Sequence, residues 1–322
     1  MHSPRAPGNL FLAFVVLTVW PASAPCQATG DERQVLRAPF PRNTRREFTV
    51  TLPGGVPLVL VRIPAGTFLM GAPETDDWAN TWERPQHEVT LTSDYLMGKY
   101  LVTQGQWKAL MGTNPSYHDY CGDDCPVDHV SWNDIAAGGG FLEKLNAHLA
   151  ETGQAGAGAL RLPTEAEWER AARGGTQTRF PFGDASGCDW GCLPCPEAEP
   201  YVWWCANSEE STRPVGTSRP NPYGLFDMHG NLWELLQDWY GDYSAEARTD
   251  PAGPSEGTYR VIRGGAWRHG LASTRPSNRY GKTLVFRHNY VGFRVAADLF
   301  AVIPRFTPDP EAARPEADPP RR

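Results

Sequence analysis

The sequence predicts one α+β domain of about 250 residues in which loops outweigh regular structure. Three observations support this prediction. Glycine and proline number 32 and 30 among 322 residues, above ordinary usage, and both favour turns over element interiors. The stretches with a strand or helix pattern are short. About 50 residues after Gly174 show neither pattern, and a loop of that length in a compact domain is usually functional.

Four strands are expected in the first part of the domain. The segment "FTVTLPGGVPLVLVRIPAG", which starts at Phe48, predicts two short strands on either side of a Pro-Gly-Gly turn. Residues 87–103 contain two further runs that are rich in β-branched and aromatic side chains, which favour strands.

Two helical segments follow. The segment "TQGQWKALMG" predicts a short helix that ends at Gly112. The segment "SWNDIAAGGGFLEKLNAHLA" predicts a second helix with Ser131 or Asn133 as its N-cap, although its three glycines lower the helix propensity.

A third helix has the clearest end signals. In "LPTEAEWERAARGG", Thr164 is the N-cap and Glu167 completes a capping box, while Gly174 ends the helix. Its buried face is expected to consist of Trp168 and the pair Ala171 and Ala172.

Residues 1–28 have the features of a secretory signal peptide. Arg5 precedes an apolar run at 10–20, which is too short to span a bilayer but suits a signal-peptide core. The sequence therefore predicts a secreted or periplasmic protein. A lipid anchor on Cys26 is less favoured, because Pro25 precedes that cysteine. No other segment has a transmembrane pattern.

The rest of the chain divides by composition. Residues 29–45 are polar and arginine-rich and predict a linker, residues 46–298 predict the folded domain, and residues 299–322 predict a Pro-rich disordered tail. The net charge is −7 and no basic stripe occurs, so nucleic acid is not an expected partner.

Six cysteines remain after the signal peptide, an even number that predicts disulfides in an exported protein. Cys121 and Cys125 flank a Gly-Asp-Asp turn, which predicts that they pair. The other four are clustered at Cys188, Cys192, Cys195 and Cys205. Their spacing leaves the pairing open, and a four-thiolate zinc site is the alternative to disulfides.

Seven sequence blocks occur in order between Ile63 and Ala296. They are "IPAGTFLMGA", "PVDHVSW", "LRLPTEAEWERAARGG", "FPFGD", "NPYGLFDMHGNLWEL", "RVIRGGAW" and "VGFRVA". Together they resemble the formylglycine-generating enzyme family, also called the sulfatase-modifying factor family. The resemblance covers nearly the whole domain and implies a loop-rich variant of the C-type lectin fold with bound calcium.

The resemblance also places the family's catalytic thiols. Members that make formylglycine carry two cysteines after the block that matches "RVIRGGAW", and this pair binds copper(I) and activates oxygen. The matching positions are His269 and Thr274, and the serine that usually follows the two glycines is Ala266. A threonine hydroxyl is a poor ligand for a soft cation. The resemblance therefore implies the fold without the copper site, and no catalytic residue is predicted.

Residues 260–281 hold five arginines and no carboxylate, a composition that suits binding an acidic or polar group. The candidate ligand-binding residues are Arg268, His269, Ser273, Arg275, Asn278 and Arg279. The alternative is that these arginines only pair with carboxylates within the fold.

A calcium site is expected in the block "DMHGNLWEL". In relatives the ligands are one early side chain, two backbone carbonyls and a glutamate, and the matching residues are Asp227, Gly230, Leu232 and Glu234. Calcium accepts such a mixture of carbonyl and carboxylate oxygens. A second calcium site of relatives starts at the position of Asn207 and Ser208, but the loop that would complete it is shortened.

The spacing of the histidines in the sequence does not support an iron site. The hercynine oxygenases resemble this chain in the "RLPTEAEWERAAR" block, but they depend on an HxxxHxE motif that is absent here. A triad could only be assembled from scattered histidines, namely His87, His118, His129, His229 and His288.

Three functions remain open, and with them whether the chain is an enzyme. The first is an exported, calcium-stabilised domain that binds a peptide, protein or glycan ligand through the family's substrate cleft. The second is an oxidase that modifies a peptide, protein or siderophore-type substrate through His269 and a metal other than thiolate-bound copper. The third is a formylglycine generator that takes its thiol from the 188–205 cluster. We expect the first.

Overall fold

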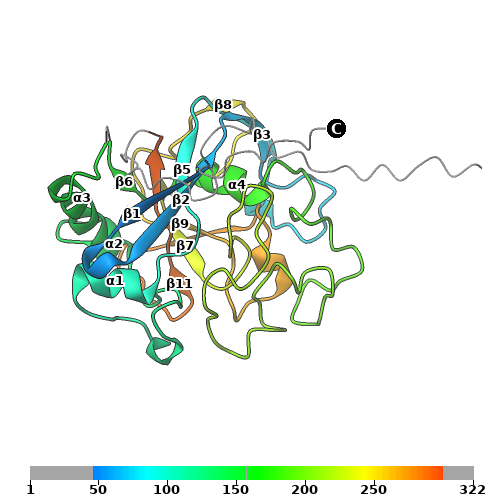
Figure 1. Ribbon diagram of the computed structural model, residues 1–322. Helices are drawn as coiled ribbons and strands as arrows, with labels where there is room; N and C mark the ends of the chain where they lie inside the picture. The colour runs from blue at the N-terminus through cyan, green and yellow to red at the C-terminus, as the bar shows by residue number, and fades with distance from the viewer. Residues whose placement is uncertain (1–45, 157, 300–322) are drawn as a thin grey trace, which may run out of the picture. The chain divides into compact units, whose positions relative to one another are not determined.

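The computed structural model describes residues 46–156 and 158–299. The expected signal peptide and linker lie outside the described residues, and so does the expected tail beyond residue 299. The described chain is loop-rich α+β, as the sequence predicts, with short strands and four α-helices joined by long irregular segments (Figure 1).

The strands of the described chain form three sheets. The five-stranded sheet has the order β1 (Glu47–Thr51), β2 (Pro57–Ile63), β5 (Tyr95–Gly98), β12 (Ala296–Asp298) and β6 (Leu160–Arg161). The four-stranded sheet has the order β10 (Arg279–Lys282), β9 (Arg260–Arg263), β7 (Trp233–Trp239) and β11 (Val291–Gly292). The three-stranded sheet has the order β3 (Gly66–Met70), β4 (His87–Leu91) and β8 (Arg248–Thr249). The pairs β11–β7 and β4–β8 are parallel.

The four strands expected near the start of the domain are present. Strands β1 and β2 pair antiparallel around the Pro-Gly-Gly turn. The two runs in residues 87–103 form β4 and β5, which belong to different sheets. Asp94 lies between them and accepts hydrogen bonds from the backbone N–H of Ala65 (2.8 Å) and from Nε of Arg62 (2.7 Å). These bonds hold the corner at which the chain leaves one sheet for the other.

Helix α1 (Gln104–Met111) follows its sequence signals. Thr103 is the N-cap and forms a capping box with Gln106, and the helix ends at Gly112, which adopts the left-handed conformation with φ 73°.

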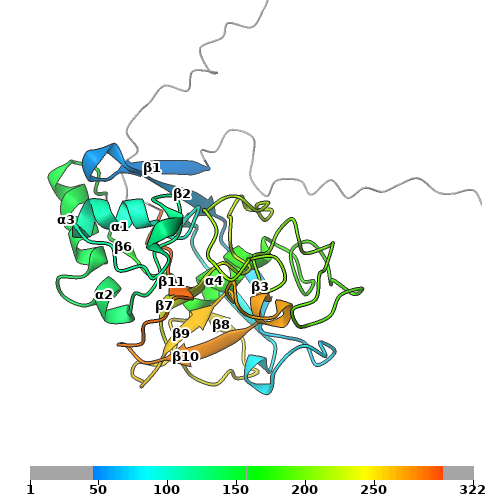
Figure 2. The same ribbon diagram turned by 90° about the horizontal axis from the view of Figure 1, so that it is seen from below.

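The second expected helix is two helices, α2 (Trp132–Ala136) and α3 (Phe141–Glu151). Ser131, and not Asn133, caps the first of them. The break falls at the glycines, because the backbone is extended at Ala137 and left-handed at Gly139, with φ 77°. Position 140 also requires glycine, since a Cβ there would lie only 2.8–2.9 Å from three carbonyl oxygens of the preceding turn. In Figures 1 and 2 the helices α1, α2 and α3 gather beside the five-stranded sheet.

Helix α4 (Glu165–Arg173) has the predicted capping box of Thr164 and Glu167 and ends at Gly174. The buried surface of α4 is wider than the expected face of Trp168, Ala171 and Ala172, because all nine residues of the helix are buried, including its charged ones. The helix packs against β3, β4, β7 and β9, so no side of it is left to the solvent. Its glutamates and arginines are accommodated by ion pairs described below.

The core has three apolar clusters. One joins α1–α3 to the five-stranded sheet, and a second surrounds Trp168 of α4. The third lies mostly in the segment between α4 and β7, which has no helix or strand, as the sequence predicts, and it also includes Leu271 of the loop after β9. Phe180 and Trp204, both fully buried, are the largest side chains of this third cluster. This loop segment is therefore packed on a core of its own.

Candidate functional site

The loop that follows β9 carries His269 and is held by a tight glycine turn. Gly264 and Gly265 both have positive φ, 96° and 71°, and a Cβ on Gly265 would lie 2.7 Å from the carbonyl oxygen of Ser273. Only glycine allows this approach without strain. The turn folds the chain back on itself, so that His269 and the short 3-10 helix Leu271–Thr274 lie beside the start of the loop.

His269 is half-buried between aromatic rings. Its ring meets those of Trp233 and Tyr290 edge-to-face, with centroids 5.8 and 5.0 Å apart. The indole Nε1 of Trp233 donates a hydrogen bond to Nδ1 of His269 over 3.3 Å. An indole N–H can only donate, so Nδ1 is the acceptor and the neutral ring carries its proton on Nε2.

The electrostatic surroundings of His269 are cationic. Burial, and next the nearby charges of Arg268, Lys282 and His288, together lower the pKa of His269 to about 4. The guanidinium of Arg268 lies 5.5 Å from the ring centre of Tyr290, and the ammonium of Lys282 lies 4.7 Å from that of Phe286. Among the described residues, neither cation has a carboxylate within ion-pair distance. We call the patch of Arg268, His269, Lys282, His288 and Tyr290 the His269 surface.

The second position of the family's thiol pair is not open to a ligand. Thr274 is fully buried, and its hydroxyl donates to the carbonyl of Leu271 over 2.8 Å. Its own carbonyl accepts a hydrogen bond from Nδ1 of His229 over 2.9 Å. Ala266 is also fully buried. Of the three aligned positions, only His269 reaches the surface.

Three of the six candidate ligand-binding residues are buried in ion-pair networks. Arg275 donates to both carboxylate oxygens of Glu83 at 2.8 Å, and Asn278 donates to the same carboxylate at 2.9 Å. Arg279 donates to both oxygens of Glu165 at 2.7 and 2.8 Å. These contacts agree with the alternative in which the arginines of residues 260–281 pair with carboxylates within the fold. Arg268 and His269 are on the surface, with Ser273 partly exposed beside them.

The expected calcium residues lie together and are buried. Burial raises the pKa of Asp227 to about 6 and also raises that of Glu234. Arg294 already pairs with both oxygens of Glu234, at 2.7 and 2.9 Å. Asp227 accepts the backbone N–H of Gly216 at 2.8 Å and forms no ion pair. A hard cation suits the carboxylate of Asp227, because the charge of the cation would offset the free-energy cost of burying that carboxylate.

The start of the second calcium site is occupied by local contacts. The side chain of Asn207 accepts the backbone N–H of Trp204 at 3.0 Å and donates to the carbonyl of Val202 at 2.8 Å. The hydroxyl of Ser208 donates to the carbonyl of Trp267 at 2.8 Å.

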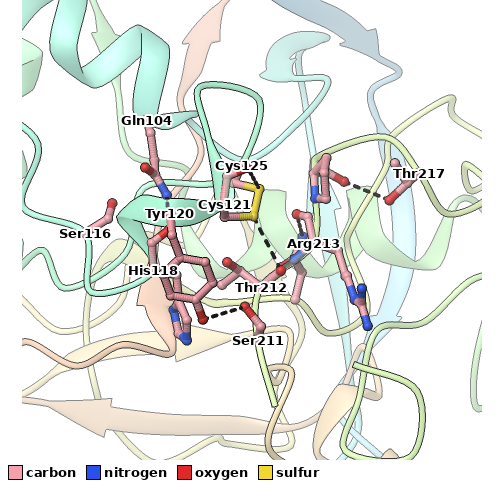
Figure 3. Close-up of a disulfide and its surroundings, with 12 residues drawn as sticks. Gln104, Ser116, His118, Tyr120, Cys121, Cys125, Ser211, Thr212, Arg213 and Thr217 are labelled. Atoms are coloured by element: carbon pink, nitrogen blue, oxygen red, sulfur yellow. Dashed lines mark hydrogen bonds between the residues drawn. A yellow bond between two sulfur atoms is a disulfide. The ribbon is translucent and has the colours of Figure 1, made fainter. Parts of the chain in front are cut away.

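All six cysteines of the described chain form disulfides. The predicted pair Cys121–Cys125 is confirmed, with Cα atoms 5.8 Å apart. Figure 3 shows this disulfide beside the segment 211–213, where Cys121 contacts the carbonyl of Thr212. The cluster forms the pairs Cys188–Cys195 and Cys192–Cys205. All four sulfurs of the cluster are in disulfides, so the cluster has no free thiolate to bind zinc.

Sequence reasoning missed that the cysteine cluster adjoins His269. The backbone N–H of Cys205 donates to the carbonyl of His269 over 3.2 Å. Leu271 and Ala272 donate to the carbonyls of Gly191 and Trp190, each over 2.9 Å. The cluster therefore forms a wall beside the His269 surface, and Trp190 is 64% exposed there. No spacing in the sequence signals this contact, because about 65 residues separate the two segments.

The scattered histidines do not assemble. His118 bonds to Asp128 (2.7 Å), His87 to the carbonyl of Pro85 (3.1 Å) and His288 to the side chain of Asn289 (2.7 Å). Within the described ranges, no three His, Cys, Asp or Glu side chains are grouped so that they could hold a metal ion.

Three sheets around a buried helix, with the site on long loops, define a C-type lectin-like fold of the formylglycine-generating type. Residues 57–299 match the family model of the sulfatase-modifying factor enzyme 1-like domain. The chain therefore belongs to the formylglycine-generating enzyme, or sulfatase-modifying factor, family.

No helix among the described residues is long and apolar enough to cross a bilayer.

Relatives support this assignment. The formylglycine-generating enzyme of Thermomonospora curvata is 30% identical over 310 residues, which cover 74% of this chain and 93% of that enzyme. The Streptomyces coelicolor enzyme is 39% identical over 184 residues, but the match spans only 52% of its length and 54% of this chain. The structure of Treponema denticola variable protein 1 has a TM-score of 0.66 and 29% identity, and covers 79% of this chain and all of that one.

Proposed function

We propose that this domain binds an acidic group of a peptide, protein or glycan partner at the His269 surface and lacks copper-thiolate oxidase activity. The observation that carries the proposal is a pair of cations, Arg268 and Lys282, that have no carboxylate partner among the described residues and lie beside a half-buried His269 whose Nε2 bears the proton. Two cations and one N–H donor favour an anion, and the partly exposed ring of Tyr290 adds contact area.

The tautomer of His269 also argues against a metal at this site. A metal binds imidazole through an unprotonated nitrogen. Nδ1 is used by Trp233, so binding through Nε2 would require the ring to change tautomer and give up that bond. The neighbouring charges of Arg268 and Lys282 would repel the cation as well.

Calcium and export form the remaining parts of the proposal. Asp227 would hold calcium, with Glu234 and the carbonyls of Gly230 and Leu232 as the other ligands that the family resemblance implies. Glu234 would have to share its carboxylate with Arg294, which pairs with both of its oxygens. Bound calcium would supply positive charge to a buried carboxylate and link the segments around it. The three disulfides suit an oxidising compartment, which supports secretion or a periplasmic location.

A direct test uses acetylated hexaglutamate as the anionic probe and hexalysine as its cationic counterpart, in calorimetric titrations. We expect hexaglutamate to bind and hexalysine not to bind, with affinity that falls as salt is raised. Arg268→Gln should weaken hexaglutamate binding about fivefold, the effect of roughly 1 kcal/mol for one exposed charge pair.

The matched control is Arg287→Gln. Arg287 is an exposed arginine of the same region, but it already pairs with Asp134 at 2.6 and 2.7 Å, so its removal should leave binding unchanged. Equal binding of the two probes, or equal loss in both variants, would contradict an anion site at the His269 surface.

The contact between Cys205 and His269 favours a second candidate, a formylglycine generator whose thiols come from the pair Cys192–Cys205. The exposed position of Cys192 makes that disulfide open to reductants. The test is to supply reduced protein with copper(I), oxygen and a sulfatase-type cysteine peptide. Aldehyde formation that is lost in Cys192→Ser would support this candidate, and no aldehyde would exclude it.

A further inference from the structure

We infer a second binding site, independent of the His269 surface, that takes a small organic ammonium ion against the buried carboxylate of Asp238. The site is a cavity of about 450 Å³. That volume is within the range of small-molecule sites.

The cavity lies where several elements meet. Its walls come from the ends of β3 and β4, the first turn of α4, the end of β7, β8 and the loop 251–254. Met70, Trp239 and the two prolines of the loop give it apolar surface, while polar groups converge on one side. An apolar cavity with a few placed polar groups is the usual form of a ligand site.

One carboxyl oxygen of Asp238 lacks a partner among the described residues. Asp238 is 3% exposed, and its Oδ1 forms no hydrogen bond. Burial, and next the carboxylate of Glu165, raise the pKa of Asp238 to about 8. A hydrogen bond from the backbone of Glu165 lowers this pKa only in part. A buried carboxyl oxygen without a partner is costly and marks a candidate ligand site.

The arginines near Asp238 have other contacts, although the charge of Arg260 also acts on Asp238 and Nε of Arg260 forms no hydrogen bond. Arg248, which lines the cavity, pairs with Glu246 at 3.3 Å. Arg279 is held by both oxygens of Glu165. Arg260 lies on the rings of Trp132 and Trp239, 4.2 and 3.5 Å from their centres, and donates to the carbonyl of Gln237. In the described part of the chain Asp238 has no ion pair.

A second acceptor lines the same cavity. Nδ1 of His87 contacts the carbonyl of Pro85 at 3.1 Å, and a carbonyl can only accept. The proton of the neutral ring is therefore on Nδ1, which leaves Nε2 as an acceptor. The ring of Tyr243 lies edge-to-face against His87, with centroids 4.8 Å apart.

This combination favours an organic cation. An ammonium group brings three donors and the positive charge that Asp238 lacks, and its carbon chain would pack on the apolar walls. A metal ion is disfavoured, because no three metal-binding side chains of the described residues are grouped here.

The test is a calorimetric titration of the full chain with n-butylammonium chloride at about pH 9, where an amine of ordinary pKa near 10 is still charged. The neutral isostere n-butanol and the anion butyrate are the matched probes. We expect saturable binding of the ammonium ion alone. Binding of all three probes with equal affinity, or of none, would overturn the inference without reliance on any variant.

Two variants localise the site. Asp238→Asn should lower ammonium affinity at least tenfold, while Asp184→Asn, which changes a carboxylate in a different cavity, should leave it unchanged. Unchanged affinity in a folded Asp238→Asn protein would refute the assignment to Asp238. These outcomes are separate from those at the His269 surface, which responds to anionic probes and to Arg268.

Discussion

Trp233 donates its indole N–H to Nδ1 of His269 over 3.3 Å, and this contact decides which nitrogen of that imidazole carries the proton. Trp233 is the first residue of β7 and is almost fully buried, so its ring is fixed by the core. The orientation of a surface histidine is thus set by a strand of the four-stranded sheet. At the position where relatives are expected to hold a reactive thiol, this chain has an immobilised, neutral hydrogen-bond donor.

His269 should make the fold sensitive to acid. Its pKa is lowered to about 4 in the folded state against 6.5 as the ordinary value, so the unfolded chain takes up the proton first as pH falls. Stability is then lost between about pH 6.5 and 4. His269→Gln should make the free energy of unfolding fall less steeply with pH, so that at the acid end the loss is smaller by an amount on the order of 2 kcal/mol. Urea unfolding across that pH range measures it; an identical slope in the variant would show that the pKa of His269 is not lowered in the fold.

The pair of Glu83 and Arg275 should be a strong structural contact. Both side chains are fully buried, and Glu83→Gln would leave the Arg275 charge without its main partner. We expect a loss of about 3–5 kcal/mol in the free energy of unfolding. The control is Glu74→Gln, because Glu74 is 82% exposed and meets Arg84 only at 3.6 Å, so its loss should be under about 1 kcal/mol. Similar losses in both variants would contradict this ranking.

Calcium should raise the melting temperature of the purified domain, because a ligand that binds only the folded state stabilises it. Asp227→Ala should abolish the increase. Glu234→Ala should destabilise the fold even with chelator present, since it leaves Arg294 buried without its partner. A melting temperature that is indifferent to both calcium and chelator would remove calcium from the proposal.

The cysteine pairing can be mapped directly. Peptide mapping of exported protein should give the pairs Cys121–Cys125, Cys188–Cys195 and Cys192–Cys205. In timed reduction and alkylation, the pair that includes the exposed Cys192 should open before the pair that includes the fully buried Cys195. Six free thiols, or one equivalent of zinc, would contradict the disulfide assignment.

The oxidised protein should not convert cysteine to formylglycine when supplied with copper(I) and oxygen. Its described chain offers no free thiolate, and the aligned positions hold His269 and the buried Thr274. Mass spectrometry of a sulfatase-type peptide provides the readout, with the double change His269→Cys and Thr274→Cys as a test for regained copper binding. Multiple turnovers by the unmodified oxidised protein would show that the active centre lies elsewhere.

Local signals in the sequence determined a large part of the fold. The capping boxes of α1 and α4, the glycines that end both helices and the hairpin of β1 and β2 depend on neighbours within a few residues, which the sequence displays directly. The ordered blocks gave the family, and the short turn between Cys121 and Cys125 gave one disulfide. The single helix expected from Ser131 onward proved to be two, because the backbone is extended at Ala137 and left-handed at Gly139.

Tertiary structure alone decided how the charged side chains are used. The sequence shows five arginines in residues 260–281, but only the fold brings Glu83 and Glu165 to Arg275 and Arg279 and leaves Arg268 without a carboxylate. It also placed the cysteine cluster against His269 and, among the described residues, left Oδ1 of Asp238 without a hydrogen-bond partner in a cavity. Such contacts join residues that are tens to hundreds of positions apart. The hydrophobic burial that closes those loops acts on the chain as a whole, and no local pattern records which distant charges it will bring together.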